Sequence, residues 1–532
     1  MTTELTPRRD FLRIATAGLA GSAFVWLPAA AQAPVPVTTQ TSAGTYNVKS
    51  YGAVGDGKNI DSPAIDKAID AAAASGGGTV FFPAGTYLSY SIHLKSHVAL
   101  YLDQGAVIVA APPMPAGGAG GYDLAEPQNP AIEAYQDYGH NHWHNSLIWG
   151  EGIRDISILG PGLIWGKGLS RGWKATDGPT AETPGVANKA IALKNCYNVN
   201  LRDFSILHGG HFGILATGVD NLTIDNLVID TNRDGMDIDC CRNVRVSNCS
   251  VNSPYDDGIC PKSSFALGYA RTTEFVTISN CFVSGMVEGT LLDGTFKPFG
   301  GCGRIKCGTE SNGGFRNITI SNCVFYDCHG LALESEDGAL LEDVTITNIS
   351  MRNVIDAPLF LRLGSRMRGP AGMAVGTLKR ITISNVISSG TRSKISSIVS
   401  GVPGHAVEDL KLSNIQIEHE GGGTTAQAAL TLAEKETGYP EPTMFGDTPS
   451  QGFYFRHVKG LEASDIKITT LKTDVRPAFV LEDVVDADFF RIKAATAPSG
   501  GVFALHDVKN FSLAGGRPLA DTFLDQVDNK KL

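Results

Sequence analysis

The chain has 532 residues, a formal net charge of −10 at pH 7 and 42% hydrophobic residues. This length and apolar content suffice for a large core, and the acidic balance excludes the basic surface that nucleic-acid binding needs. Beyond the N-terminal region, no stretch is long and apolar enough to span a bilayer. We therefore expect a globular protein without a nucleic-acid or membrane partner.

The N-terminal residues resemble a twin-arginine export signal. Arg8 and Arg9 precede a short apolar region, and small residues end it at Ala31–Ala33. We predict that residues 1–33 direct export and that residues 34–532 form a single catalytic domain, periplasmic or secreted. The alternative, an amphipathic N-terminal helix, is disfavoured by two glycines within the stretch.

A helix is predicted over residues 63–74. Asp61 and Ser62 can cap its start, and Gly76–Gly78 end it. The repeats that follow need a polar cap on their open end. We expect this helix to supply the cap, within an N-terminal segment of about residues 45–115.

Short alternating strands with Asn or Asp between them recur through most of the chain. Copies begin at Asn198, Asn221, Asn243, Phe275, Asn317, Asp343, Arg380, Asp409 and Gly460. The central Asn of successive copies lies at positions 226, 248, 280, 322, 348, 385 and 414. Period-2 alternation repeated at this interval is typical of a β-solenoid, whose coils bury their apolar faces by stacking.

The predicted fold is therefore all-β, a right-handed parallel β-helix with a short N-terminal capping helix. The competing leucine-rich repeat would need a helical half, which the Val- and Ile-rich copies lack. The recurrent Asn should stack as a ladder, each amide bonding to the backbone of the next coil. Long insertions are expected at about residues 252–273, 284–316, 353–379 and 418–459, where loops can build a binding face.

All ten cysteines lie between Cys196 and Cys328. Three of them occupy the same repeat position, at 249, 281 and 323, which favours stacked interior thiols over disulfides. Pairing of Cys302 with Cys307, or of Cys323 with Cys328, stays open.

Two acidic segments interrupt the strand pattern. Residues 231–239 read TNRDGMDID and residues 254–264 read PYDDGICPKSS. Crowded carboxylates cost stability unless a partner or a reaction uses them. Asp in an Asp-Gly pair also simply makes turns, which is the alternative for Asp234, Asp237 and Asp257; Asp239 is expected to be structural.

These segments resemble the motifs of glycoside hydrolase family 28, the polygalacturonase family of pectin-degrading β-helices. Asn232 to Asp237 is similar to the family's N-T-D-G-x-D, and Asp256-Asp257-Gly258 is similar to its D-D; the opening from Tyr51 to Tyr87 is shared by many pectin-active β-helices. The resemblance implies inverting hydrolysis, with Asp256 as general acid and Asp234 and Asp257 activating water, about 6.5–9.5 Å apart. Asn232 and Asp237 would contact substrate, and the reaction needs no metal or cofactor.

Downstream, the chain departs from the family pattern. Polygalacturonases carry G-H-G in the coil after D-D and R-I-K one coil later, whereas here Arg304-Ile305-Lys306 comes first and Glu334 occupies the later coil. Alternation places Arg304, Lys306 and Glu334 on the outer face. The outward cations predicted to bind an acidic saccharide are Lys262, Arg304, Lys306 and Arg362. The alternative is that they only neutralise neighbouring acids in ion-pair ladders.

Other candidate substrate contacts do not follow the repeat pattern. His329 is similar in type, though not in coil, to the family's histidine, and a structural histidine is the alternative. In the run HNHWHN, residues 140–145, Trp143 is expected to stack on a sugar ring while His140 or His144 donates a hydrogen bond. Zinc is disfavoured there because the run has no Cys or carboxylate.

The predicted function is inverting hydrolysis of a pectic poly- or oligosaccharide, galacturonan first and rhamnogalacturonan second. The insertions suggest exo action. A pectic polysaccharide lyase on the same fold and a non-catalytic glycan-binding β-helix are the rivals. The protein is expected to be a monomer.

Overall fold

The computed structural model describes residues 44–114, 121–136, 139–172, 183–498 and 500–532. Residues 43–532 form one compact unit, and no helix in the described ranges is long and apolar enough to cross a membrane. The predicted export signal, residues 1–33, lies outside the described residues and stays a prediction.

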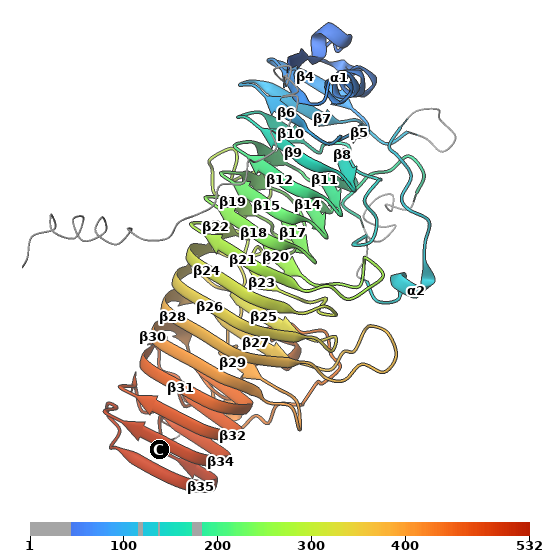
Figure 1. Ribbon diagram of the computed structural model, residues 1–532. Helices are drawn as coiled ribbons and strands as arrows, with labels where there is room; N and C mark the ends of the chain where they lie inside the picture. Colours follow the sequence, from blue (N-terminus) through green and yellow to red (C-terminus); the bar gives the residue numbers. More distant parts are fainter. Residues whose placement is uncertain (1–43, 115–120, 137–138, 173–182, 499) are drawn as a thin grey trace, which may run out of the picture. The chain divides into compact units, whose positions relative to one another are not determined.

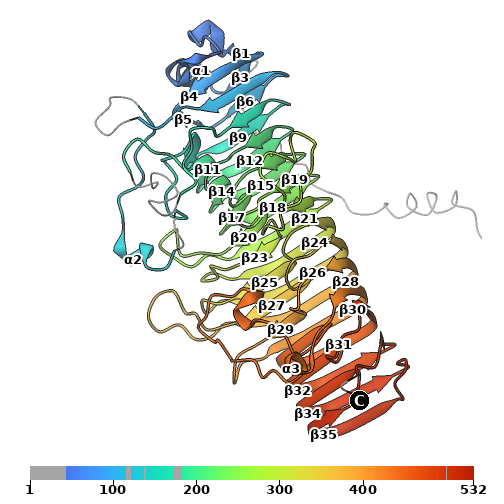
Figure 2. The same ribbon diagram turned by 180° about the vertical axis from the view of Figure 1, so that it is seen from behind.

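The compact unit is a right-handed parallel β-helix, as predicted (Figures 1 and 2). Each early coil contributes one strand to each of three columns. The first column comprises β1 (Gly44–Asn47), β3 (Gly78–Phe82), β6 (Val98–Leu102), β9 (Arg154–Leu159), β12 (Tyr197–Arg202), β15 (Asp220–Asp225), β18 (Arg242–Ser247) and β21 (Thr273–Ser279). The second comprises β2 (Asp56–Ile60), β4 (Gly85–Ser89), β7 (Ala106–Ala110), β10 (Leu163–Trp165), β13 (Ser205–Leu207), β16 (Val228–Asp230), β19 (Ser250–Asn252) and β22 (Phe282–Ser284).

The third column is a separate six-stranded sheet that later strands extend. Its strands are β5 (Ile92–His93), β8 (Ile148–Glu151), β11 (Lys189–Lys194), β14 (Phe212–Thr217), β17 (Met236–Asp239), β20 (Ile259–Lys262), then β23 (Lys306–Cys307), β25 (Leu331–Ser335), β27 (Leu359–Leu363) and β29 (Ser397–Ser400).

Later coils fuse the columns into long strands. These are β24 (Phe315–Tyr326), β26 (Leu340–Arg352), β28 (Thr377–Thr391), β30 (Val407–Gly421), β31 (Phe453–Lys472), β32 (Phe479–Phe490) and β34 (Phe503–Ala514), with the short β33 (Lys493–Ala494). The last strand, β35 (Thr522–Lys531), pairs antiparallel with β34 and ends the stack. The short helices are α2 (Pro130–Glu133), α3 (Thr425–Ala428), and 3-10 helices at Val48–Tyr51 and Pro442–Phe445.

The predicted capping helix is confirmed as α1 (Ser62–Ala74), at the end of the stack opposite to β35 (Figure 1). Its buried face includes Ile65 and Ile69, which join the core. Asp61 does not cap it through its side chain. The carboxylate instead accepts hydrogen bonds from the backbone of Val54 and Gly55, at 2.7 and 3.1 Å, and so fixes the preceding loop.

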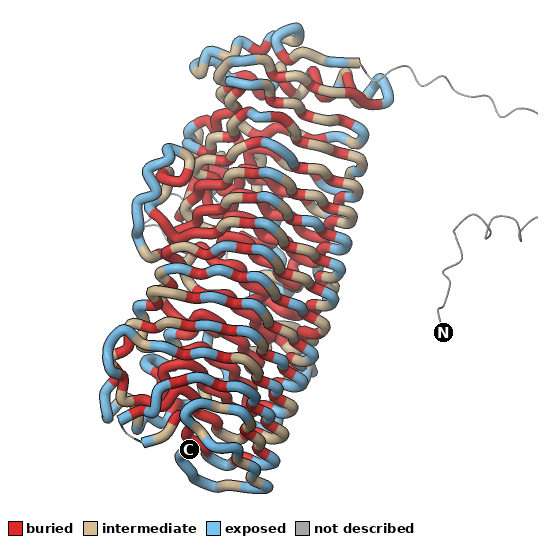
Figure 3. Tube along the Cα trace, turned by 90° about the vertical axis from the view of Figure 1, so that its left-hand side faces the viewer, coloured by how far each residue is buried: buried red, intermediate tan, exposed pale blue. Residues whose placement is uncertain are grey.

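Strands of the first column alternate between the core and solvent. In β18, Val244 and Val246 are buried while Arg242 and Arg245 are exposed, and Figure 3 shows the same alternation along the coils. Third-column strands such as β17, β20 and β27 are instead buried on both faces. Because they lack period-2 alternation, β20 and β27 fell within predicted insertions, at residues 252–273 and 353–379. That part of the prediction is wrong.

The predicted asparagine ladder forms, but amide bonds to amide rather than to backbone. Asn280 donates to Asn248 at 3.3 Å, Asn322 to Asn280 at 3.2 Å and Asn348 to Asn322 at 3.0 Å. All four have positive φ, between 56° and 58°. Asn tolerates this left-handed conformation better than other side chains do, which explains its recurrence at a turn.

All ten cysteines are free thiols, and Cys249, Cys281 and Cys323 stack inside the core as predicted. The two alternative disulfides are not formed. Burial raises the pKa of Cys307 to about 12, which makes this thiol a poor nucleophile at neutral pH.

The ladder allows a stability test at Asn322. Alanine should lower the free energy of unfolding by about 1–3 kcal/mol, because it loses two amide bonds and strains the positive φ. Glycine loses the same bonds without the strain, so it should cost less. Urea unfolding of the two variants checks this, and equal losses would show that the conformation at this turn contributes nothing.

Candidate active site

The two acidic motifs occupy successive turns that lead into β17 and β20. Met236 pairs with Ile259, so Asp257 stacks directly on Asp234 and Asp256 stands beside this pair. Asp234 and Asp256 are 22 residues apart, the length of the shortest coil step, and this spacing predicts that Asp256 stacks on Asp234. The prediction is wrong, because the step from Met236 to Ile259 is one residue longer.

One carboxylate oxygen from each of Asp234, Asp256 and Asp257 lies within 4.8 Å of the other two. This is closer than the separation of roughly 6.5–9.5 Å expected between acid and base. The physical reason is the spacing of neighbouring strands, about 4.8 Å, which sets the distance between equivalent positions of successive coils. Asp234 and Asp257 are buried, whereas the side chain of Asp256 is 25% exposed.

The displaced R-I-K lies on the coil directly after these acids, as the sequence count predicted. Ile305 pairs with Ile259, and Lys306 pairs in turn with Ala332. Lys306 Nζ lies 2.6 Å from one oxygen of Asp257, and Arg304 Nε donates to the other at 2.9 Å. Both oxygens of Asp257 therefore face a cation from the following coil.

The neighbours of Asp234, Asp256 and Asp257 shift the pKa values of these three carboxyl groups in different directions. Burial alone would raise the pKa of Asp257, but Lys306 and Arg304 outweigh it and hold that pKa below its ordinary value. Burial raises the pKa of Asp256, an effect that Arg233 opposes and the charge of Asp257 reinforces. Burial and then the charges of Asp237 and Asp256 raise the pKa of Asp234 well above its usual range.

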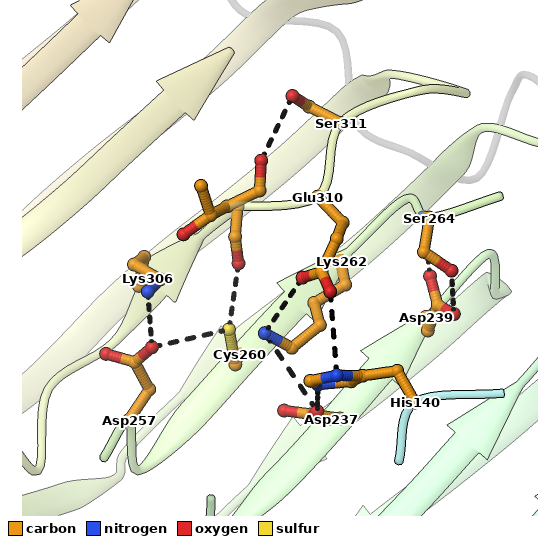
Figure 4. A network of polar contacts seen from close by, with 12 residues as sticks. His140, Asp237, Asp239, Asp257, Cys260, Lys262, Ser264, Lys306, Glu310 and Ser311 are labelled. Atoms are coloured by element: carbon orange, nitrogen blue, oxygen red, sulfur yellow. Dashed lines mark hydrogen bonds and ion pairs between the residues drawn. The ribbon is translucent and has the colours of Figure 1, made fainter. Parts of the chain in front are cut away.

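A second charged layer lies further along β17 and β20. Lys262 Nζ stands 3.4 Å from Glu310 and 4.0 Å from Asp237, and His140 Nε2 is 2.8 Å from Asp237 (Figure 4). Burial lowers the pKa of His140, but Glu310 and Asp237 together raise it to about 9. Asp239 is buried and accepts hydrogen bonds from Ser264, as expected of a structural residue.

The downstream cations point outward as predicted, but loops cover them. Arg304 Nη2 lies 2.5 Å from Glu441, and Arg362 donates to the carbonyls of Glu434 and Lys435 at 3.1 and 3.3 Å. Arg304 and Arg362 are fully buried. Arg304 forms the ion pairs with neighbouring acids that the alternative describes, whereas Arg362 donates hydrogen bonds to carbonyls and lies 4.0 Å from Glu336. Their contact with substrate stays a prediction.

Glu334 and His329 lie one coil beyond the R-I-K. Burial raises the pKa of Glu334 to about 7, although Lys306 and Arg304 oppose the shift. His329 Nδ1 is 3.1 Å from Asp356, and the His329 side chain stays 22% exposed. His329 thus stays partly accessible to solvent, 3.9 Å from Glu441.

The HNHWHN run does not present an open aromatic face. Trp143 is buried against Phe212 and Leu215, and its indole N–H donates to Thr217 at 3.0 Å. Sugar stacking on Trp143 would need this packing to open, so the structure does not support it. The three histidines point to different carboxylates: His140 to Asp237, His142 to Glu133 and His144 to Glu151. They share no common ligand position.

Two partners of the site were missed from the sequence. Arg233, inside the first motif, pairs with Asp256, and Glu441 pairs with Arg304. Glu310, which pairs with Lys262, is one of the acids that the ion-pair alternative included. Arg233 could have been predicted as an ion-pair partner, because it lies within the first acidic motif, next to Asp234. Glu441 is 137 residues away from Arg304, and no sequence pattern connects the two.

The model of the Glycosyl hydrolases family 28 matches residues 127–267, which include all three acids. A model of rhamnogalacturonase A/epimerase, pectate lyase-like proteins matches residues 45–158. This part of the chain is thus similar to glycoside hydrolase family 28, the family that its motifs resemble.

Individual relatives are distant. A probable polygalacturonase from Vitis vinifera is 23% identical over 332 residues, which cover 59% of this chain and 62% of that protein. The plasmin and fibronectin-binding protein A of Streptococcus pneumoniae is 35% identical over 189 residues, covering 34% of this chain and 23% of that one. The chain therefore spans less than two thirds of the length of either relative.

Solved structures share the fold. The family 28 exopolygalacturonase of Yersinia enterocolitica superposes with a TM-score of 0.57 at 19% identity, covering 89% of this chain and 79% of that one. The hyperthermoactive exopolygalacturonase of Thermotoga maritima gives 0.50 at 15% identity, covering 92% and 95%.

The buried Glu334 predicts a pH dependence of stability. The folded state binds its proton more tightly than the unfolded state does, so this stabilisation is present below about pH 4.5 and is lost as pH rises through about 7. Between pH 4.5 and 8, wild type should lose on the order of 1–3 kcal/mol more unfolding free energy than Glu334→Gln loses. Urea unfolding across this range measures it. Parallel curves for the two proteins would contradict the buried, proton-binding state of Glu334.

Proposed function

We propose that the protein hydrolyses a pectic poly- or oligosaccharide with inversion at the anomeric carbon. The observation that carries the proposal is that the pKa values of two adjacent acids are shifted in opposite directions. Asp256 is partly exposed and its pKa is raised, whereas Lys306 and Arg304 keep Asp257 ionised. Hydrolysis of a glycosidic bond needs these two forms side by side, an acid for the leaving oxygen and a base for water.

Asp256 is the general acid in this proposal, because it is the most exposed of the three carboxyl groups. Asp234 and Asp257 hold the attacking water. Two acceptors that share one water at about 2.8 Å each stand about 4.6 Å apart, which fits the spacing of these oxygens.

The loops that cover the downstream cations support exo action. Glu441, Glu434 and Lys435 lie over Arg304 and Arg362, and so they close the outer face of the third column beyond the acids. A long chain could not pass over those coils. A chain end bound beside His329 and Glu441 would place its first linkages near Asp256. The family and relatives point to galacturonan or rhamnogalacturonan as the polymer.

Replacing the acid tests the mechanism. Asp256→Asn should lower kcat on oligogalacturonides about 10²- to 10⁴-fold, the usual contribution of a general acid, with little change in the unfolding midpoint. Reducing-sugar release measures the rate. Activity close to that of the wild type would rule out Asp256 as the acid, and no activity of the wild type on any pectic substrate would contradict the proposed function.

Arg233 provides a test through pH. Its charge lowers the pKa of Asp256, so Arg233→Ala should raise that pKa and move the alkaline limb of kcat/KM to higher pH, by about one unit. Arg233→Lys keeps the charge and should move the limb less. If the alkaline limb does not move in Arg233→Ala, the limb does not report the pKa of Asp256.

Exo action predicts the products. Hydrolysis should release small saccharides from the first minutes while the viscosity of the polymer falls slowly, because the closed outer face admits only chain ends. Chromatography of products with parallel viscometry decides this. Early oligosaccharides of mixed length with a rapid loss of viscosity would contradict a closed groove.

A further inference from the structure

A cavity of about 600 Å³ lies on the N-terminal side of the acids, outside the site described above. Its lining residues come from β2, β4, β7 and β10 and from the segments that follow β7 and β10. Those used below are Trp165, Lys167 and Arg171.

The charge of this lining is opposite to that of the whole chain. Among the residues that the structure describes, the lining holds two cations, Lys167 and Arg171, and no acid, in a protein whose formal net charge is −10. Lys167 Nζ lies 5.1 Å from the centre of the Trp165 ring, and both side chains reach solvent. The cavity therefore offers an aromatic face and positive charge together.

The Trp165 ring is held in place from behind. Its indole N–H donates to Nδ1 of His208 at 3.3 Å. Burial, and then the charge of Arg171, lower the pKa of His208, which keeps the imidazole neutral and able to accept this bond. An aromatic ring that is fixed before binding loses little conformational entropy when a ligand stacks on it.

The cavity is aligned with the catalytic turn. Trp165 pairs with Leu207, and Leu207 pairs with Asp230, which ends the strand just before the first acidic motif. Two coil steps of about 4.8 Å put Trp165 about 10 Å from that strand along the stack. Arg171 also bonds to Glu288 at 2.7 Å, and Glu288 is hydrogen-bonded by Asn232 of the motif.

We propose that this cavity is a remote binding subsite for an acidic sugar residue of the substrate chain. The apolar face of the sugar ring stacks on Trp165, and its carboxylate is held by Lys167 and Arg171. A chain whose end lies beside Glu441 would thus run over Asp256 and towards α1, on the side that the downstream loops leave open. This inference rests on the proposed function, and it names the charge of the sugar bound at a distance from the cleaved bond.

Substrate length provides the kinetic test. Trp165→Ala should lower kcat/KM on long oligogalacturonides about three- to tenfold and leave the shortest cleaved oligosaccharide unaffected, because only a long chain reaches the cavity. Lys167→Gln should cost about two- to fivefold on long chains at low salt, less at high salt, and nothing on methyl-esterified chains, which carry no charge. Trp165→Phe should restore most of the stacking. Lys509→Gln, an exposed lysine on β34, is the matched control and should match wild type throughout.

Binding in the absence of turnover separates this inference from the proposed function. Calorimetric titration of Asp256→Asn with a long oligogalacturonate should give an affinity that Trp165→Ala weakens by the same three- to tenfold. The subsite would be overturned if Trp165→Ala had equal effects on short and long chains. It would also be overturned if Trp165→Ala had no effect in the kinetic assay or in the titration. Failure of the wild type to cleave any pectic chain would overturn the proposed function alone, and the titration would still decide the subsite.

Discussion

The distance between successive coils determines which charged side chains meet in this protein. Equivalent positions of successive coils lie about 4.8 Å apart, so a charged side chain on one coil meets the same position on the next. Asp257 is stacked on Asp234 by this rule and is then neutralised by Lys306 and Arg304 from the following coil. Crowded acids are thus tolerated because neighbouring coils supply the opposing charge.

The same constraint makes the acids different from one another. Asp257 has a cation against each oxygen, Asp256 lies at the open edge with Arg233, and Asp234 lies between other acids. Two successive turns therefore hold an ionised carboxylate and two carboxyl groups that bind their protons more tightly. Such a division is what acid and base catalysis requires, and no conformational change is needed to create it.

The repeat could be predicted from the sequence because the first-column strands face the core on one side and solvent on the other. Third-column strands such as β20 and β27 lack that contrast, since loops bury their outer face, and they were mistaken for insertions. The acids and the coil of the R-I-K could be predicted from spacing. The covering of Arg362 by the loop near Glu434, and the burial of Trp143, depend on contacts between segments far apart in the chain. Local sequence patterns do not contain such contacts.

Proton NMR of the newly formed anomeric centre, recorded while the purified protein acts on oligogalacturonides, tests the inverting mechanism most directly. The proposed mechanism predicts a saturated product that first appears with the configuration opposite to that of the cleaved bond and then mutarotates. A product born with retained configuration would contradict the roles given to Asp234 and Asp257, and an unsaturated product would show that the three acids serve a lyase instead.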